Sequence, residues 1–302
     1  MDCRACRKGG YDVIGFRFGV SVGWPGSRSE WVAKARRAEE LGYDVFTVPD
    51  HLGMPAPIPS LVLVAEATER IRLGTLVLNT PFYNPVLLAR DVAALDQFSG
   101  GRIELGLGAG YVKDEFDAAG IPFLGAGARI DHVEQTVRTL RKLYADPGYQ
   151  PAPARPAGPS ILIAGSGNRL LRTAARHADV VGLPGAAFTE SGLMTAASAD
   201  QLAERATYLH GLLGDRRDRV ELNLQLWAVA TPSERDTLGN RVRRWLPGFT
   251  DDQVGAAPAV LAGTPRQIAD SVRECRERYG ITYLTVLEPD LDTFAPVIEL
   301  LK

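Results

Sequence analysis

The chain alternates short apolar segments with amphipathic helical patterns along most of its length, and this alternation restricts the fold more than any other feature. Parallel strands that are joined by helices are buried on both faces, so they appear as continuous apolar runs. Such runs predict strands at residues 16–22, 44–49, 72–79, 102–108, 159–164, 179–183, 220–230 and 282–287. The helical spacing of apolar residues predicts helices at residues 27–41, 60–70, 84–98, 129–144, 168–178, 200–213, 264–279 and 293–301.

Strands that alternate with helices in this way, eight of each, are typical of a (β/α)8 barrel. We therefore predict an α/β protein with the TIM-barrel fold; a doubly wound parallel sheet shows the same alternation and is the alternative. Residues 1–14 are predicted to form a mobile tail and residues 15–302 a single barrel domain. Longer connections at residues 111–128 and 184–199 follow strands, where a barrel keeps its active site.

The charge balance of the chain argues against several classes of partner. Lys and Arg number 34 and Asp and Glu 36, which gives a net charge of −2 and no strongly basic face for nucleic acid. No apolar run approaches the roughly 20 residues that span a bilayer, and the charged N-terminus lacks the apolar core of a signal peptide. We therefore expect a cytoplasmic protein that binds a small molecule, with no nucleic-acid or membrane partner.

The cysteines give no sign of a disulfide framework or of a metal site. Three cysteines, Cys3, Cys6 and Cys275, cannot all pair, which favours a reducing compartment. Cys3 and Cys6 have the spacing of half a zinc site, but no second pair completes the four ligands. The chain also lacks an HExxH motif and a dense carboxylate cluster. We expect no metal.

Two polar residues follow the second predicted strand. Polar residues at the carboxyl ends of barrel strands point toward the active site, and Asp50 and His51 hold that position. Imidazole exchanges a proton near neutral pH, so His51 is the candidate general acid or base; the alternative is a structural histidine that caps a turn. Asp50 either orients the imidazole, binds a ligand or caps the same turn.

A glycine-rich turn follows the fifth predicted strand. It consists of Gly165, Ser166, Gly167 and Asn168 and leads into a predicted helix. Glycine lets the backbone approach a ligand closely, and a helix N-terminus offers free N–H groups and a positive dipole end to a phosphate. This turn is the candidate phosphate site, with an ordinary glycine turn as the alternative.

Three glycines alternate along the fourth predicted strand and just beyond it. Gly106, Gly108 and Gly110 indicate a backbone that another group approaches closely. That group is either a flat ring system or a neighbouring part of a crowded barrel end.

Four segments give the chain a resemblance to a known family. Residues 73–120 hold, in order, an apolar strand, an Asn-Pro helix start, the turn LDQFSGGR and the strand end GLGAG. The other segments are AEELGYDVFTVPDH, ILIAGSGNRLLRTAARHAD and GTPRQIADSVRE. Together they resemble the luciferase-like flavin and deazaflavin oxidoreductases, and among these the actinobacterial-type enzymes that use coenzyme F420. The resemblance extends over residues 16–301.

The resemblance implies a barrel that binds a flavin-like ring at the carboxyl ends of its strands. It implies a cis peptide bond between non-proline residues near Leu76 and Val77, in a bulge that supports the ring. It also matches Asp50 and His51 to an Asp-His pair whose histidine lies near the reactive face. The other coenzyme contacts that it implies are Asn79, Thr80, Ala109, Gly110 and Tyr111, with Gly165, Ser166, Gly167 and Asn168 at the phosphate.

One position departs from the family's pattern. The sugar-phosphate dehydrogenases of the family carry an acidic residue where this chain has Tyr111, which argues against sugar-phosphate oxidation. Trp24, Tyr111, Phe188 and Trp227 are instead candidates for an aromatic pocket that binds an apolar substrate. For Trp227, core packing is the alternative.

The resulting hypothesis is an F420-dependent oxidoreductase. It would transfer a hydride between the deazaflavin C5 and a small organic substrate, with His51 donating or accepting the proton. The alternatives are an FMN-dependent luciferase-like monooxygenase and a barrel that binds a flavin without catalysis. The resemblance also makes a homodimer an expectation.

Overall fold

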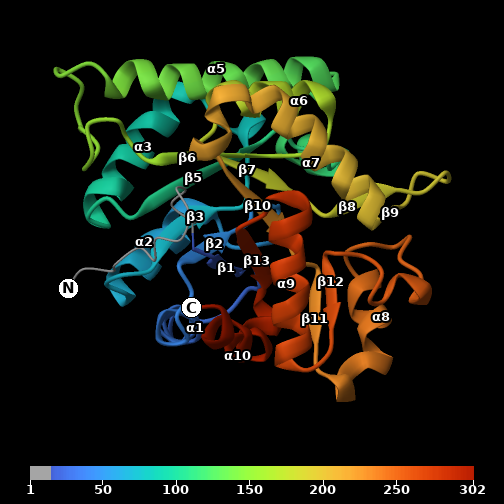
Figure 1. The fold of residues 1–302 in the computed structure, drawn as a ribbon. Coiled ribbons are helices and arrows are strands. Elements are labelled where there is room, and N and C mark those ends of the chain that lie inside the picture. Colours follow the sequence, from blue (N-terminus) through green and yellow to red (C-terminus); the bar gives the residue numbers. More distant parts are fainter. Residues whose placement is uncertain (1–14) are drawn as a thin grey trace.

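The computed structural model describes residues 15–302, in which parallel strands close into a barrel surrounded by helices (Figure 1). The barrel strands in chain order are β1 (Arg17–Ser21), β2 (Val45–Val48), β3 (Arg72–Thr75), β4 (Leu78–Asn79), β5 (Ile103–Gly108), β6 (Ser160–Ala164), β7 (Val180–Leu183), β10 (Glu221–Gln225) and β13 (Tyr283–Leu287). The short β3 and β4 together form the third strand position, and the pairing of β3 with β5 closes the barrel. The predicted TIM barrel is confirmed. The predicted tail, residues 1–14 with Cys3 and Cys6, lies outside the described residues.

The helices cover the outside of the barrel because each has one apolar face. In α1, for example, Trp31, Ala35 and Ala38 are buried at helical spacing. The surrounding helices are α1 (Arg28–Glu40), α2 (Pro57–Ala67), α3 (Pro85–Phe98), α5 (Ala126–Tyr144), α6 (Asn168–His177), α7 (Ala199–Leu213), α9 (Pro265–Tyr279) and α10 (Leu291–Leu301). Shorter helices, α4 (Lys113–Ala119) and α8 (Arg235–Arg243), lie in connections that follow strands. Among the residues described, no helix is both long and apolar enough to cross a membrane.

The single strand predicted at residues 220–230 is wrong. β10 ends at Gln225, and the chain then leaves the barrel sheet to form β11 (Ala228–Ala230), which pairs in parallel with β12 (Val260–Ala262). The link between β10 and β11 is held by backbone hydrogen bonds to two distant segments: Leu226 N donates to Thr285 O and Trp227 N donates to Ala259 O, each at 2.8 Å. Both strands are buried, so the apolar run continues through the break and the sequence gives no sign of it.

The connection at residues 184–199 also holds more structure than the sequence indicated. β8 (Ala186–Phe188) and β9 (Met194–Ala196) form an antiparallel hairpin that projects beyond the barrel (Figure 1). Several predicted helices begin too late: α2 begins at residue 57, α5 at residue 126 and α10 at residue 291. The start of α2 was missed because Pro57 and Pro59 lie in its first turn, where proline is tolerated.

An ionic cluster lies at the amino-terminal end of the barrel. The Arg17 guanidinium, on the first residue of β1, donates to Glu104 Oε2 of β5 at 2.9 Å and also pairs with Glu221 of β10. The same guanidinium lies over the Tyr283 ring of β13, 4.5 Å from its centroid. Because Glu104 is only 3 % exposed, its charge depends on this partner. The cluster joins four strands at the end opposite the one where the predicted site residues gather.

We predict that Glu104→Ala destabilises the protein by about 2 kcal/mol, because it removes the buried acceptor of a charged hydrogen bond from Arg17, which keeps its second partner Glu221. The measurement is chemical denaturation of the whole chain at neutral pH. Glu277→Ala, at an exposed position on α9, is the matched control and should change the unfolding free energy by less than about 0.5 kcal/mol. Equal unfolding midpoints for the two variants would contradict this role of the cluster.

Candidate active site

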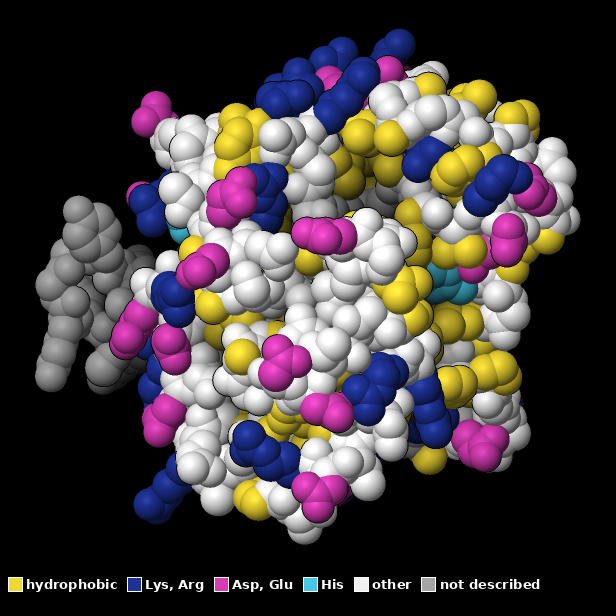
Figure 2. Space-filling view, turned by 90° about the vertical axis from the view of Figure 1, so that its right-hand side faces the viewer, with side chains coloured by type: hydrophobic (Ala, Val, Ile, Leu, Met, Phe, Trp, Pro, Cys, Tyr) yellow, Lys and Arg dark blue, Asp and Glu magenta, His cyan; other side chains and the backbone are white. Residues whose placement is uncertain are grey.

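The carboxyl ends of the barrel strands meet at one end of the molecule, which we call the barrel mouth. Asp50 and His51 follow β2, Asn79 ends β4, residues 109–111 follow β5 and residues 165–168 follow β6. The β8–β9 hairpin and α8 also arise from connections on this side. Figure 2 looks onto the face that carries these elements and shows hydrophobic side chains bordering recessed parts of the surface. The barrel thus gathers the predicted site residues from distant parts of the chain.

His51 is hydrogen-bonded to a carboxylate at the barrel mouth. Its Nδ1 lies 2.8 Å from Glu115 Oε1 of α4, and the two side chains are 30 % and 14 % exposed. The Tyr111 ring packs edge-on against the imidazole, with 5.9 Å between ring centroids and an interplanar angle of 83°. The imidazole is therefore held on two sides and is still open to a ligand.

Asp50 connects two strand ends. Its Oδ2 accepts a hydrogen bond from Asn79 N at 2.9 Å, which joins the end of β2 to the end of β4. Burial raises the pKa of Asp50, and this outweighs the opposing effect of the bonds from Asn79 and from the Tyr83 hydroxyl. The Asp50 carboxylate thus bonds to the backbone of another strand end, and the carboxylate on the imidazole is that of Glu115.

The third strand position contains a bulge. The peptide bond between Leu76 and Val77 is cis, at the place that the family resemblance implied. The bulge explains two of the alternating glycines in β5. A Cβ on Gly106 would lie 1.9 Å from Thr75 O, and one on Gly108 would lie 2.5 Å from Val77 Cγ2. The group that approaches these glycines closely is therefore the neighbouring strand. Of the two interpretations of the glycines, this agrees with a crowded barrel end and not with a bound ring.

The residues beyond the bulge are tightly packed. Asn79 and Thr80 are 5 % and 0 % exposed, and within residues 15–302 Asn79 Oδ1 and Thr80 Oγ1 have no hydrogen-bond partner. Gly110 has φ +68°, and a Cβ there would lie 2.3 Å from Asn79 Oδ1. Ala109 packs against the main core. An unpaired buried acceptor costs free energy, so Asn79 Oδ1 suits a polar group brought in by a ligand.

The glycine turn before α6 presents free backbone amides. Gly167 is the N-cap of α6 and no side chain caps the helix, so its first N–H groups lack the usual partner. A Cβ built on Gly167 would meet nothing within 4 Å, and residues 166–169 are exposed. The turn therefore faces open space, which fits a phosphate group.

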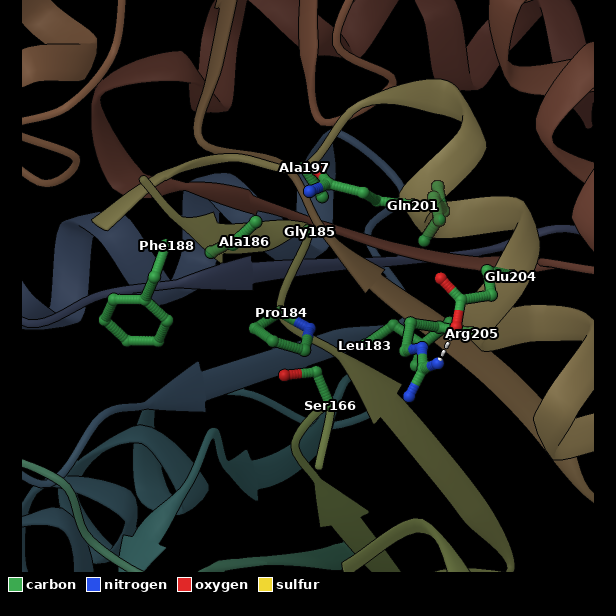
Figure 3. A pocket seen from close by; sticks show the side chains of 12 residues that line it. Ser166, Leu183, Pro184, Gly185, Ala186, Phe188, Ala197, Gln201, Glu204 and Arg205 are labelled. Atoms are coloured by element: carbon green, nitrogen blue, oxygen red, sulfur yellow. Dashed lines mark hydrogen bonds and ion pairs between the residues drawn. The ribbon is translucent and has the colours of Figure 1, made fainter. Parts of the chain in front are cut away.

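A cavity of about 300 Å³ lies beside this turn (Figure 3). Ser166 and Pro184 face each other on one side of it, and Glu204 and Arg205 of α7 lie on another. Arg205 Nη1 donates to Asn168 Oδ1 at 2.6 Å, and the same guanidinium is ion-paired with Glu204, which offsets its charge beside the first residue of α6. The neighbouring Arg169 points away, to Asp131 at 2.6 Å.

The four aromatic candidates do not share one cavity. Phe188, on the hairpin, is 67 % exposed and lines the cavity beside Ser166, whereas Trp24 and Trp227 do not line it. Trp24 packs on Trp245, with ring centroids 5.6 Å apart. Trp227 is half-buried, and its Nε1 donates to Pro184 O at 2.8 Å. Tyr111 instead contacts His51.

Several residues of the barrel mouth were not selected as site residues from the sequence. Glu115 comes four residues after Tyr111 on the seven-residue helix α4, and only the fold brings it to His51. Tyr83 reaches the site from the segment just before α3, and Arg205 reaches it from α7. No sequence motif marks either residue. The described residues contain no group of three or more His, Cys, Asp or Glu side chains that would hold a metal ion.

The chain matches one family model and several curated proteins. The luciferase-like monooxygenase family matches residues 13–283. An F420-dependent glucose-6-phosphate dehydrogenase of Intrasporangium calvum is 32 % identical over 143 residues, which are 42 % of this chain and 43 % of that protein. An uncharacterised protein of Mycobacterium tuberculosis is 29 % identical over 181 residues, 48 % of this chain and 62 % of that one. The chain therefore aligns with less than two thirds of each of these relatives.

Solved structures share the fold over nearly the whole chain. An F420-dependent secondary alcohol dehydrogenase has a TM-score of 0.72 at 16 % identity, with 96 % of this chain and 98 % of that chain covered. A monooxygenase from Streptomyces bottropensis has a TM-score of 0.74 at 20 % identity, with 94 % and 97 % covered.

The parallel barrel and the family match agree on the class of protein to which this chain belongs. The chain belongs to the luciferase-like monooxygenase family.

We predict that Gly106→Ala disrupts the barrel mouth, because the new Cβ would overlap Thr75 O and push β3 away from β5. Overpacking of this kind costs about 3 kcal/mol, and the thermal unfolding midpoint measures it. Gly211→Ala is the matched control: its Cβ meets nothing within 4 Å and lies inside α7, so this variant should be at least as stable as the parent. Gly106→Ala with an unchanged midpoint would show that the strand tolerates a side chain there.

Proposed function

We propose that this enzyme uses coenzyme F420 to transfer a hydride between the deazaflavin C5 and a small organic substrate. The observation that carries the proposal is the half-exposed imidazole of His51, held by Glu115 at the same barrel mouth as the uncapped N-terminus of α6. The first element suits proton exchange with a substrate and the second suits a phosphate. The F420-dependent names of the curated relatives support the choice of coenzyme.

The residues at the barrel mouth fit a coenzyme with a ring and a phosphate. The ring would lie against the bulge at Leu76 and Val77, with Asn79, Ala109, Gly110 and Tyr111 around it. Thr80 is fully buried, so it would shape the site without touching the ring. The phosphate would bind the amides of Ser166, Gly167 and Asn168, beside the open space at Gly167. The Gly165 amide, which the sequence also suggested, is already hydrogen-bonded to Gly182 O at 3.0 Å and is not free for a ligand. When bound, the deazaflavin supplies the site that accepts or donates the hydride. The chain itself supplies orientation and excludes water around the reacting atoms.

His51 would move the proton that accompanies the hydride. An imidazole can donate or accept a proton near neutral pH, so it serves either direction of the reaction. Asp50, whose carboxylate joins β2 to β4, would hold the His51 backbone in place. Trp24, Phe188 and Trp227 would contribute aromatic surface to an apolar substrate from separate parts of the mouth.

An FMN-dependent monooxygenase is the second candidate. The fold is shared with a solved monooxygenase at a TM-score of 0.74, and the glycine turn would accept the phosphate of either coenzyme. The two functions differ in their use of oxygen: reduced FMN with substrate would consume O₂, whereas hydride transfer with F420 proceeds without it. A barrel that binds a flavin without catalysis would show neither activity.

The proposal also covers the setting of the enzyme. We propose a cytoplasmic protein with a small-molecule substrate, no nucleic-acid or membrane partner, and a homodimeric assembly. The near-neutral charge of −2 supports the absence of a nucleic-acid partner.

We predict that His51→Ala lowers turnover with F420 by about 10²–10⁴-fold and leaves the Kd for the coenzyme unchanged, because general acid–base groups contribute this much to rate. Steady-state kinetics and a fluorescence titration measure the two quantities. His210→Ala, on α7, is the control and should match the parent in both. Full turnover in His51→Ala would remove this histidine from the mechanism.

We predict that Gly167→Leu weakens F420 binding about 10- to 100-fold, because its side chain would fill the space in front of the α6 amides and remove charge-assisted hydrogen bonds. Gly125→Leu is a matched control. Gly125 is also the N-cap of a helix, has no side-chain cap bond, and faces open space. Both variants lose the same capping preference, so a change in affinity confined to Gly167→Leu reports the phosphate site. Equal affinity in the two variants would place the phosphate elsewhere.

A further inference from the structure

The hydrogen bond between His51 and Glu115 assigns separate tasks to the two ring nitrogens. We propose that Glu115 is a positioning residue that fixes the tautomer and the direction of the His51 imidazole, so that Nε2 is the nitrogen that exchanges a proton. The inference rests on the proposed role of His51 and adds a residue that acts through it.

The chemistry of the pair determines the tautomer. A carboxylate only accepts hydrogen bonds, so the 2.8 Å contact between His51 Nδ1 and Glu115 Oε1 requires the hydrogen on Nδ1. The neutral ring then carries its free lone pair on Nε2. Glu115 is only 14 % exposed, so little water competes for this bond.

The helix that carries Glu115 is held by a different side chain. Phe116 is fully buried, and its ring packs edge-on against Phe82 and Phe123 with 4.9 Å between centroids in each pair. α4 is therefore anchored from the position next to Glu115. The Glu115 carboxylate is free to serve the imidazole, and its removal need not unfold the helix.

The other groups around the imidazole do not replace Glu115. The Asp50 carboxylate is engaged by Asn79 N and by the Tyr83 hydroxyl. The Tyr111 ring lies edge-on to the imidazole and limits its rotation without an ion pair. Within the described residues, Glu115 is the group that is hydrogen-bonded to the His51 ring.

The arrangement gives the proton a defined path. In the oxidation direction a bound deazaflavin would take up the hydride, with its two electrons, and the proton left on the substrate would pass to Nε2 of His51. The ring is then an imidazolium whose Nδ1–H still donates to Glu115, and the opposite charges stabilise each other. In the reduction direction the hydride and the proton return to the substrate.

The test compares Glu115→Ala, Glu115→Gln and Asp114→Ala, the last being an exposed carboxylate on the same helix. The first readout is the ¹⁵N NMR spectrum of the histidines in the coenzyme-free protein, with the His51 signal assigned by its loss in His51→Ala. We expect the Nδ1–H tautomer in the parent, in Asp114→Ala and in Glu115→Gln, whose amide oxygen still accepts. We expect a mixture of tautomers in Glu115→Ala.

The second readout is kinetic. Loss of orientation in Glu115→Ala should lower kcat by about 10- to 100-fold with an unchanged Kd for F420. Glu115→Gln should fall between Glu115→Ala and the parent, because it keeps the direction of the ring and loses the charge. If Glu115→Ala does not fold, the tautomer of His51 in Glu115→Gln decides, and a ring that carries its hydrogen on Nε2 in that variant would overturn the proposal.

The outcomes separate this inference from the proposed function. An Nδ1–H tautomer that survives in Glu115→Ala, with turnover equal to Asp114→Ala, would overturn the positioning role. A different result would be a changed tautomer in Glu115→Ala together with full turnover in His51→Ala. That result would keep Glu115 as the group that orients the ring and would overturn the catalytic role of His51.

Discussion

Closure of the parallel sheet is the constraint on which the rest of the structure depends. β3 pairs with β5 through Leu73 and Gly74, opposite Ile103 and Glu104, and this contact completes the barrel. Once the barrel is closed and all its strands are parallel, every strand ends at the same mouth. His51, Glu115 and the turn before α6 meet there although they lie far apart in the sequence. At the opposite end, the Arg17 cluster joins β1, β5, β10 and β13.

The same closure shapes the third strand position. Its backbone breaks into β3 and β4 around Leu76 and Val77, and β5 accommodates it with Gly106 and Gly108, where a side chain would meet the neighbouring strand. The two glycines therefore serve the bulge, and the bulge forms part of the surface where we propose that the ring lies. The packing of β5 against the third strand position therefore also determines the shape of the proposed coenzyme site.

The sequence was sufficient for the order of the elements and for the strand ends. Continuous apolar runs and helical spacing predicted the barrel because both depend on neighbouring residues. The break after β10 could not be predicted, since Leu226 and Trp227 are held by bonds to Thr285 and Ala259, far away in the chain. The partner of His51 was missed for the same reason: no local pattern distinguishes Glu115 from Asp114, and only the packing of Phe116 turns α4 so that Glu115 meets the imidazole. The sequence placed Asp50 at the end of a strand, but its bond to Asn79 N could not be predicted without knowing that β2 and β4 end together.

The family is established by its match to residues 13–283, and the choice between two coenzymes on one scaffold is the central claim. It is tested most directly by titrating the same purified protein with F420 and with FMN, followed by the fluorescence of each coenzyme, and by competing one against the other. Our account predicts saturable binding of F420 that FMN displaces only at a large excess. Tighter binding of FMN, or no binding of F420, would contradict it.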